Sequence, residues 1–183
     1  MAKTGRKFGW RGVMVIVVLI AAGRVSTHGQ ASGTLGTPAA PSDARVRAED
    51  PALSTLMRQA IDQSATFRGL VEAIQATDGI VYVTRGRCGH YVRACLLHWM
   101  AAAGPNRMVR VVVDSGRQTD IETMASLGHE LTHALEVLAE PSVRTGAGMF
   151  HLYRGAVQGV FETEAAIKAG EAVYVELKRR RAN

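Results

Sequence analysis

The segment from Thr119 to Pro141 constrains the fold of this 183-residue chain most strongly. It opens with a capping-box pattern, Thr-Asp-Ile-Glu, and it ends at a proline. Between these limits, apolar and small residues recur at helical spacing: Ile121, Met124, Ala125, Gly128, Leu131, Thr132, Leu135 and Leu138. The pattern predicts a long helix with one buried face, on which Gly128 allows a neighbouring element to approach closely.

The same helix contains the string His129-Glu130-Leu131-Thr132-His133. Residues four apart project from one helix face, so the two imidazoles can reach one Zn²⁺ while Glu130 lies beside it. The composition of the chain predicts roughly 0.01 such strings by chance. The sequence therefore predicts a metal site with His129 and His133 as ligands.

A second motif follows at residues 161–166, which read Phe-Glu-Thr-Glu-Ala-Ala and contain an E-x-x-A element. With both motifs the chain resembles gluzincin-type zinc metallopeptidases, in which a second helix supplies a glutamate as the third ligand. The resemblance implies a zincin-like fold, a Zn²⁺ cofactor and Glu162 as the third ligand. The metzincin continuation, a glycine and a third histidine, is replaced here by Glu136 and Ala139.

Two residues compete with Glu162 for the metal. On a helical wheel Glu162 shares a face with alanines and Val173, whereas Glu164 shares a face with Lys168 and is expected in solvent. The two glutamates lie about 200° apart on a helix, so only one can face the metal. His151 is a more distant candidate. Many gluzincins place an acid or amide directly after the E-x-x-A alanine, where this chain has Ala166, so a different carboxylate has to orient a ligand histidine.

The resemblance implies hydrolysis of peptide bonds in a peptide or protein substrate, with Glu130 as the general base. Tyr153 is a candidate donor to the developing oxyanion, and packing against the core is its competing interpretation. The alternative function is a non-catalytic zinc-binding protein of the cell envelope with a structural or partner-binding role. Two histidines and one glutamate leave a coordination position open for water, which favours catalysis.

Residues 1–31 have the features of a signal peptide. A basic stretch precedes the apolar run Val13–Ala22, which as a helix would be roughly 15 Å long, about half of what a bilayer requires. We therefore expect export to a periplasmic or extracellular location. An uncleaved anchor, the competing interpretation, would restrict membrane contact to this segment. Residues 32–50, rich in Ser, Gly, Pro and Ala, predict a flexible tether.

Cys88 and Cys95 are the two cysteines of the chain. In an oxidising compartment this spacing favours an intrachain disulfide. The alternative is a metal cluster of both cysteines with His90 and His98, but the spacing matches no common zinc pattern.

Residues 51–183 predict a single domain of the α+β class. Helical spacing extends from Pro51 to about residue 76, and strands are expected at Ile80–Val83, Tyr91–His98 and Met108–Val113 in an antiparallel meander. The last of these strands is weighed as an edge for an extended peptide and as ordinary sheet core. A loop with Gly146 and Gly148 then leads to a final helix that starts near Phe161.

The charge of +6 is concentrated at the N-terminus. Residues 1–31 hold five basic side chains and no acids, which leaves 17 basic against 16 acidic residues in the rest of the chain. A nearly neutral domain without interleaved aromatics argues against nucleic-acid binding. The oligomeric state is left open by the sequence.

Overall fold

A computed structural model describes residues 44–89, 92–114, 116, 118–156 and 162–182. The chain divides into two units, Met1–Pro38 and Ala39–Asn183, and all described residues belong to the second. The predicted signal peptide and the first part of the predicted tether lie outside the described residues. No helix in the described ranges is long and apolar enough to cross a bilayer.

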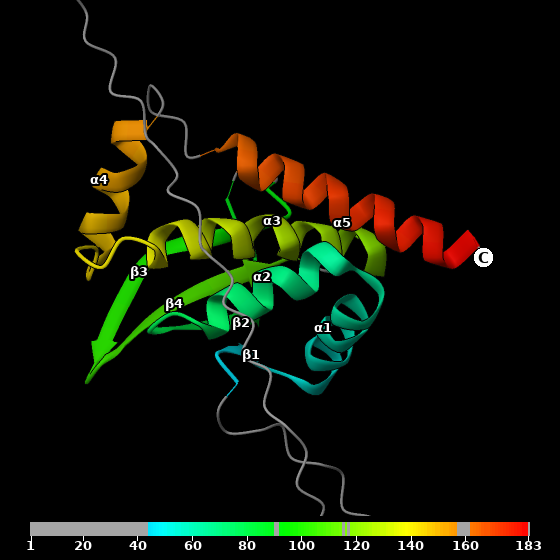
Figure 1. The fold of residues 1–183 in the computed structure, drawn as a ribbon, viewed down its shortest axis with the longest axis horizontal. Coiled ribbons are helices and arrows are strands. Elements are labelled where there is room, and N and C mark those ends of the chain that lie inside the picture. The colour runs from blue at the N-terminus through cyan, green and yellow to red at the C-terminus, as the bar shows by residue number, and fades with distance from the viewer. Residues whose placement is uncertain (1–43, 90–91, 115, 117, 157–161, 183) are drawn as a thin grey trace, which may run out of the picture. The chain divides into compact units, whose positions relative to one another are not determined.

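The described part is an α+β arrangement of a four-stranded mixed sheet and five helices (Figure 1). The elements in chain order are β1 (Val46–Ala48), α1 (Pro51–Gln63), α2 (Ala65–Gln75), β2 (Gly79–Arg85), β3 (Ala94–Ala103), β4 (Asn106–Val113), α3 (Asp120–Leu138), α4 (Gly146–Ala156) and α5 (Glu164–Ala182).

The sheet has the strand order β1-β2-β4-β3, so the predicted antiparallel meander is wrong. β1 pairs in parallel with β2, β2 pairs in parallel with β4, and only β3 and β4 are antiparallel. β4 lies in the interior of the sheet, where both of its edges are paired. This position agrees with its apolar sequence, since Val109, Val111 and Val113 are fully buried. Met108–Val113 therefore has no free edge for a peptide, and the edges of the sheet are β1 and β3.

The ordered domain begins before Pro51. Val46–Ala48, which the sequence analysis assigned to the tether, forms β1 and pairs with Val81–Val83. Val46 is buried in the core, and Asp50 caps α1 by accepting a hydrogen bond from the Leu53 amide at 2.9 Å. The predicted tether thus extends too far towards the C-terminus, because three residues are too few to show a periodic pattern.

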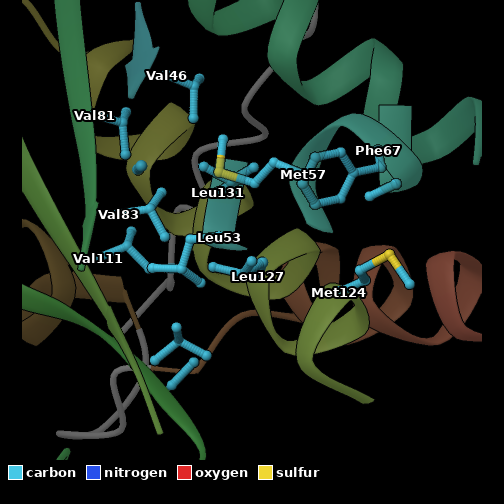
Figure 2. Packing of buried hydrophobic residues seen from close by; sticks show 14 of the residues in the cluster. Val46, Leu53, Met57, Phe67, Val81, Val83, Val111, Met124, Leu127 and Leu131 are labelled. Atoms are coloured by element: carbon cyan, nitrogen blue, oxygen red, sulfur yellow. The ribbon is translucent and has the colours of Figure 1, made fainter. Parts of the chain in front are cut away.

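The core lies between the sheet and the helices α1, α2 and α3 (Figure 2). Val81, Val83 and Val111 project from the strands, while Leu53, Phe67 and Leu127 come from the three helices and are fully buried. The helical spacing predicted for residues 51–76 is confirmed, with Ser64 ending α1 and capping α2. This core holds α3 against the sheet and so fixes the helix that carries His129 and His133.

α3 confirms the predicted boundaries. Thr119 is its N-cap, and the capping box with Glu122 is complete. α5 runs alongside α3 (Figure 1), and a Cβ atom added at Gly128 would lie 2.8 Å from Cγ2 of Val173 on α5. The glycine predicted to allow a close approach therefore does so.

Residues 146–156 form α4, where the sequence analysis expected a loop. The two glycines lower the helix propensity, but Met149 and Tyr153 are buried on one face of the helix and pack beside Val137. A Cβ atom at Gly146 would collide with the backbone carbonyl of His98 on β3. Gly146, which the sequence analysis took as a sign of a loop, thus allows α4 to pack closely against β3.

Candidate metal centre

Three side chains converge where α3 meets the segment before α5. Nε2 of His129 lies 3.2 Å, and Nε2 of His133 lies 3.5 Å, from the same Oε1 of Glu162. One ligand atom from each residue lies within 4.8 Å of the other two, so this group could hold a metal ion. The structure brings together the three ligands that the sequence predicted.

The spacing of these atoms suits a small tetrahedral ion. Ligands about 2.0–2.1 Å from a tetrahedral zinc are separated from one another by about 3.3 Å. The two distances from Glu162 to the histidines lie on either side of that value. Because the donors are two nitrogens and one oxygen, the set suits a transition-metal ion such as Zn²⁺ and differs from the oxygen-rich sites of Ca²⁺ or Mg²⁺.

Glu162 reaches the centre from the segment that precedes α5, since that helix begins at Glu164 and not near Phe161. The hydroxyl of Thr163 accepts a hydrogen bond from the Ala166 amide at 3.2 Å and so caps the first turn. The helical-wheel argument therefore selected the glutamate that lies beside the two histidines, but for a reason that the structure does not support. Glu162 is placed by a helix cap.

The competing residues lie elsewhere. Glu164 is 81% exposed and pairs with Lys168 at 2.6 Å, as expected for a solvated helix face. His151 is exposed on α4, where its ring stacks edge-on with Phe150 at 6.2 Å between centroids. Neither residue belongs to the cluster of possible ligands.

Glu130 stands beside the three ligands and is held by β3. Its Oε2 accepts a 2.7 Å hydrogen bond from the Leu96 amide, and its Oε1 lies 4.0 Å from Nε2 of His129. Burial is the main cause that raises the pKa of Glu130 to about 7. A carboxylate of this basicity can accept a proton near neutral pH.

Glu136 supplies the carboxylate that Ala166 does not provide. Its Oε2 lies 3.0 Å from Nδ1 of His133, and its Oε1 accepts a 2.7 Å hydrogen bond from the Thr163 hydroxyl. Although burial opposes ionisation, the hydrogen bonds with His133 and Thr163 outweigh it and lower the pKa of Glu136. The ionised carboxylate therefore orients Nε2 of His133 towards Glu162 and joins α3 to the segment that carries the third ligand.

The two histidines differ in their electrostatic surroundings. Burial is the main cause that lowers the pKa of His129, although the charge of Glu162 opposes it. For His133 burial also opposes the charged ring, but the nearby carboxylates outweigh burial and raise its pKa. A neutral ring is the form that binds a metal, so the lowered pKa of His129 favours metal binding, whereas the raised pKa of His133 makes a proton a competitor for the same nitrogen.

Arg107 anchors the far end of the ligand helix. Its guanidinium donates hydrogen bonds to the carbonyls of Val137 and Leu138, the last residues of α3, and to those of Glu140 and Val143. It also pairs with Asp78 at 2.6 Å. The helix C-terminus carries carbonyls with no partner inside the helix, and this cation satisfies them. α3 is thus fixed at both ends.

Tyr153 packs against the centre from α4. Its hydroxyl donates a 2.9 Å hydrogen bond to the backbone carbonyl of His133, and the two rings meet edge-on at 5.6 Å between centroids. Burial is the main cause that raises the pKa of Tyr153. These contacts match the packing interpretation, and the role of Tyr153 as an oxyanion donor stays a prediction.

Two cavities meet at the centre, and His129, Glu130 and Glu162 line both. The larger, of about 790 Å³, extends along α3 and α5. The smaller, of about 340 Å³, extends towards Tyr153 and the middle of β3. Their volumes fall in the range of about 300–1,000 Å³ that is typical of ligand sites.

The predicted disulfide between Cys88 and Cys95 is confirmed. With both sulfurs joined, neither is available as a thiolate ligand for the alternative cluster with His90 and His98. The bridge ties the loop before β3 to that strand, and Val92 of this loop lines both cavities. A disulfide is typical of an oxidising, exported environment.

Sequence reasoning missed three contributors to the centre: Glu136, Thr163 and the Leu96 amide. Glu136 could have been found, since it lies three residues after His133 and so on the same helix face. The Leu96 amide carries no signal in the sequence, because it reaches Glu130 only through the tertiary packing of β3 on α3. No family model, curated protein or solved structure matches this chain in comparisons with known proteins.

Proposed function

We propose that this chain is an exported zinc-dependent metallopeptidase that hydrolyses peptide bonds, with His129, His133 and Glu162 as zinc ligands. One observation carries the proposal: the three ligand atoms and the Glu130 carboxylate line a common cavity. A site that only stabilises the fold is normally closed by a fourth protein ligand. A three-ligand site that faces a cavity leaves room for water and substrate.

Zn²⁺ bound at this site would polarise the scissile carbonyl and lower the pKa of water. Glu130 is placed to take a proton from the attacking water and to deliver it to the leaving amine. The Leu96 amide holds one oxygen of Glu130, while the other oxygen points towards His129. Burial favours this proton transfer because it raises the pKa of the carboxyl group to about 7.

An extended peptide fits the surroundings of the centre. β3 is an edge strand, and both Ala94 and Leu96 line the smaller cavity beside Glu130. The Leu96 amide is hydrogen-bonded to Glu130, and other backbone groups on the outer edge of such a strand can pair with a substrate chain. β3 therefore takes the place of Met108–Val113 as the candidate peptide-binding edge.

Glu130→Gln tests the proposal because the amide keeps the size of the side chain and removes its basicity. We expect the variant to retain about one zinc per chain and to lose hydrolysis of a quenched-fluorescence peptide library. His133→Ala is the matched control and should lose the metal. Normal turnover by Glu130→Gln would contradict the assignment of the general base. Zinc in the parent chain without hydrolysis of any peptide would favour the alternative, a non-catalytic zinc protein of the cell envelope.

A further inference from the structure

We propose that the larger cavity binds an extended stretch of the substrate polypeptide that carries bulky apolar side chains. This inference rests on the proposed peptidase function and names the substrate class of the same site. We call the cavity the α3–α5 groove and define it by its apolar lining residues: Val92, Ala94, Ala125, Ile167, Tyr174 and Val175.

The groove follows two helices for the length of a short peptide. Its lining residues recur at intervals of three and four along both α3 and α5, from Glu122 to Glu130 and from Ile167 to Val175. Eight residues of helix span about 12 Å. An extended chain rises about 3.3 Å per residue, so the groove accommodates about three or four substrate residues.

Exposed apolar side chains are concentrated along this groove. Five large hydrophobic residues are exposed in the described ranges, and three of them line the groove: Val92 (47%), Ile167 (43%) and Val175 (42%). Val92 lies on the loop before β3, whereas the other two lie on α5. Single exposed hydrophobic residues are ordinary, but several around one cavity mark a surface that is buried on binding.

The charges along the groove disfavour an acidic partner. Nη1 of Arg93 lies 3.3 Å from Oε1 of Glu122, so the basic group that lines the groove is already paired with an acidic one. Glu171 adds a further exposed carboxylate. This arrangement disfavours acidic peptides, and the apolar contacts proposed here do not depend on the charge of the peptide.

The position of the groove selects a polypeptide as its occupant. It leads directly to His129, Glu130 and Glu162, so a bound segment is continuous with the bond that would be cleaved. Ala94 lines its wall and begins the edge strand β3, which offers backbone partners to a second chain. A lipid would use the apolar side chains alone.

Binding to zinc-loaded Glu130→Gln protein tests the inference without consuming the ligand. Two fluorescent peptides of equal length and charge are compared by anisotropy, one with consecutive leucines and phenylalanines at its centre and one with serines there. We expect the apolar peptide to bind at least about tenfold more tightly, because burial of even one large apolar side chain favours binding by about that factor.

Ile167→Asp combined with Val175→Asp, added to Glu130→Gln, should abolish this difference and leave the zinc content unchanged, because both side chains are exposed and neither is a ligand. Phe150→Ser is the control, since Phe150 is an exposed apolar residue of α4 that lines neither cavity. The difference should persist in that variant.

Equal binding of the two peptides, or a preference that survives the double substitution, would overturn the inference. Co-sedimentation with phospholipid vesicles, lost in the double variant, in place of peptide binding would also overturn it and assign the groove to a membrane. Hydrolysis is measured separately in the parent protein. Selective binding without hydrolysis would contradict the proposed function and leave the groove assignment intact. Hydrolysis without an apolar preference would contradict the groove assignment and leave the proposed function intact.

Discussion

Glu136 lies with one carboxylate oxygen 3.0 Å from Nδ1 of His133, and its other oxygen accepts a hydrogen bond from Thr163. One side chain thus orients a ligand ring on α3 and fixes the residue that follows Glu162. The bridge therefore adds a polar link to the apolar packing that holds α3 beside the start of α5. A carboxylate behind a ligand histidine also increases the basicity of the ring.

Glu136→Ala should therefore weaken zinc binding by about 10- to 100-fold while the fold is retained. The measurement is competition with a chromophoric chelator, together with circular dichroism. Glu164→Ala is the matched control, because Glu164 is a solvated glutamate of the same region and should leave the affinity unchanged. Unaltered affinity in Glu136→Ala would show that the bridge does not support the metal.

Asp78→Asn should destabilise the protein at pH 7 by about 1–3 kcal/mol, because it removes a charged partner from Arg107, which is only 2% exposed. The larger losses of stability that follow when a fully buried ion pair is broken are not expected here, because Asp78 is 35% exposed and its charge is screened by solvent. Asp62→Asn, a change at an exposed position, should stay within about 0.5 kcal/mol. Urea unfolding measures both.

The same pair predicts a pH dependence. The hydrogen bond with Arg107 is the main cause that lowers the pKa of Asp78 in the folded state. Its contribution to the free energy of unfolding is therefore complete above the unfolded value of about 3.9 and is lost as pH falls through the folded value. The stability difference between the parent and Asp78→Asn should shrink in acid. A difference that stayed constant down to pH 2 would contradict this linkage.

Two glycine-to-alanine changes should have opposite effects. Gly69 on α2 has no atom within 4 Å of an added Cβ, so Gly69→Ala should stabilise by up to about 1 kcal/mol through helix propensity. At Gly128 the added Cβ would meet Val173, a buried β-branched side chain with little rotameric freedom, at 2.8 Å. Gly128→Ala should destabilise by about 1–2 kcal/mol and weaken zinc binding, because it separates α5 from α3. Thermal unfolding and metal titration of both variants measure this.

Replacing Cys88 and Cys95 with serine should lower the free energy of unfolding by about 2–3 kcal/mol, the value for a short closed loop. Zinc content should not change, since no ligand lies in the loop. Urea unfolding with and without reductant provides the comparison, and the parent in reductant should match the double variant. Loss of zinc on reduction would contradict the separation of the disulfide from the metal centre.

Local signals in the sequence were sufficient to predict α3, because its capping box, apolar stripe and terminal proline all lie within the segment itself. The two candidate histidine ligands followed from spacing on that helix, and Glu162 followed from the resemblance to gluzincins that the E-x-x-A element carries. The order of the strands could not be derived in the same way. β4 pairs with β2 although β3 lies between them in the sequence, and Val109, Val111 and Val113 of β4 are fully buried.

Context also decided the elements that the sequence analysis missed. α4 contains glycines that are unfavourable in a helix, and its helical form depends on packing of Met149 and Tyr153 against α3 and β3. Glu162 is positioned by the Thr163 cap and by Glu136, and neither contact was included in the helical-wheel argument. The form of α4 and the position of Glu162 depend on contacts between segments that are distant in the sequence, and a periodic pattern does not reveal such contacts.

The metal content of the purified chain, measured by plasma mass spectrometry beside Glu162→Ala and Glu164→Ala, tests the central claim most directly. We predict about one zinc per chain in the parent, retention in Glu164→Ala and loss in Glu162→Ala. A parent chain without zinc after reconstitution, or equal zinc in both variants, would contradict the assignment of His129, His133 and Glu162 as a zinc site.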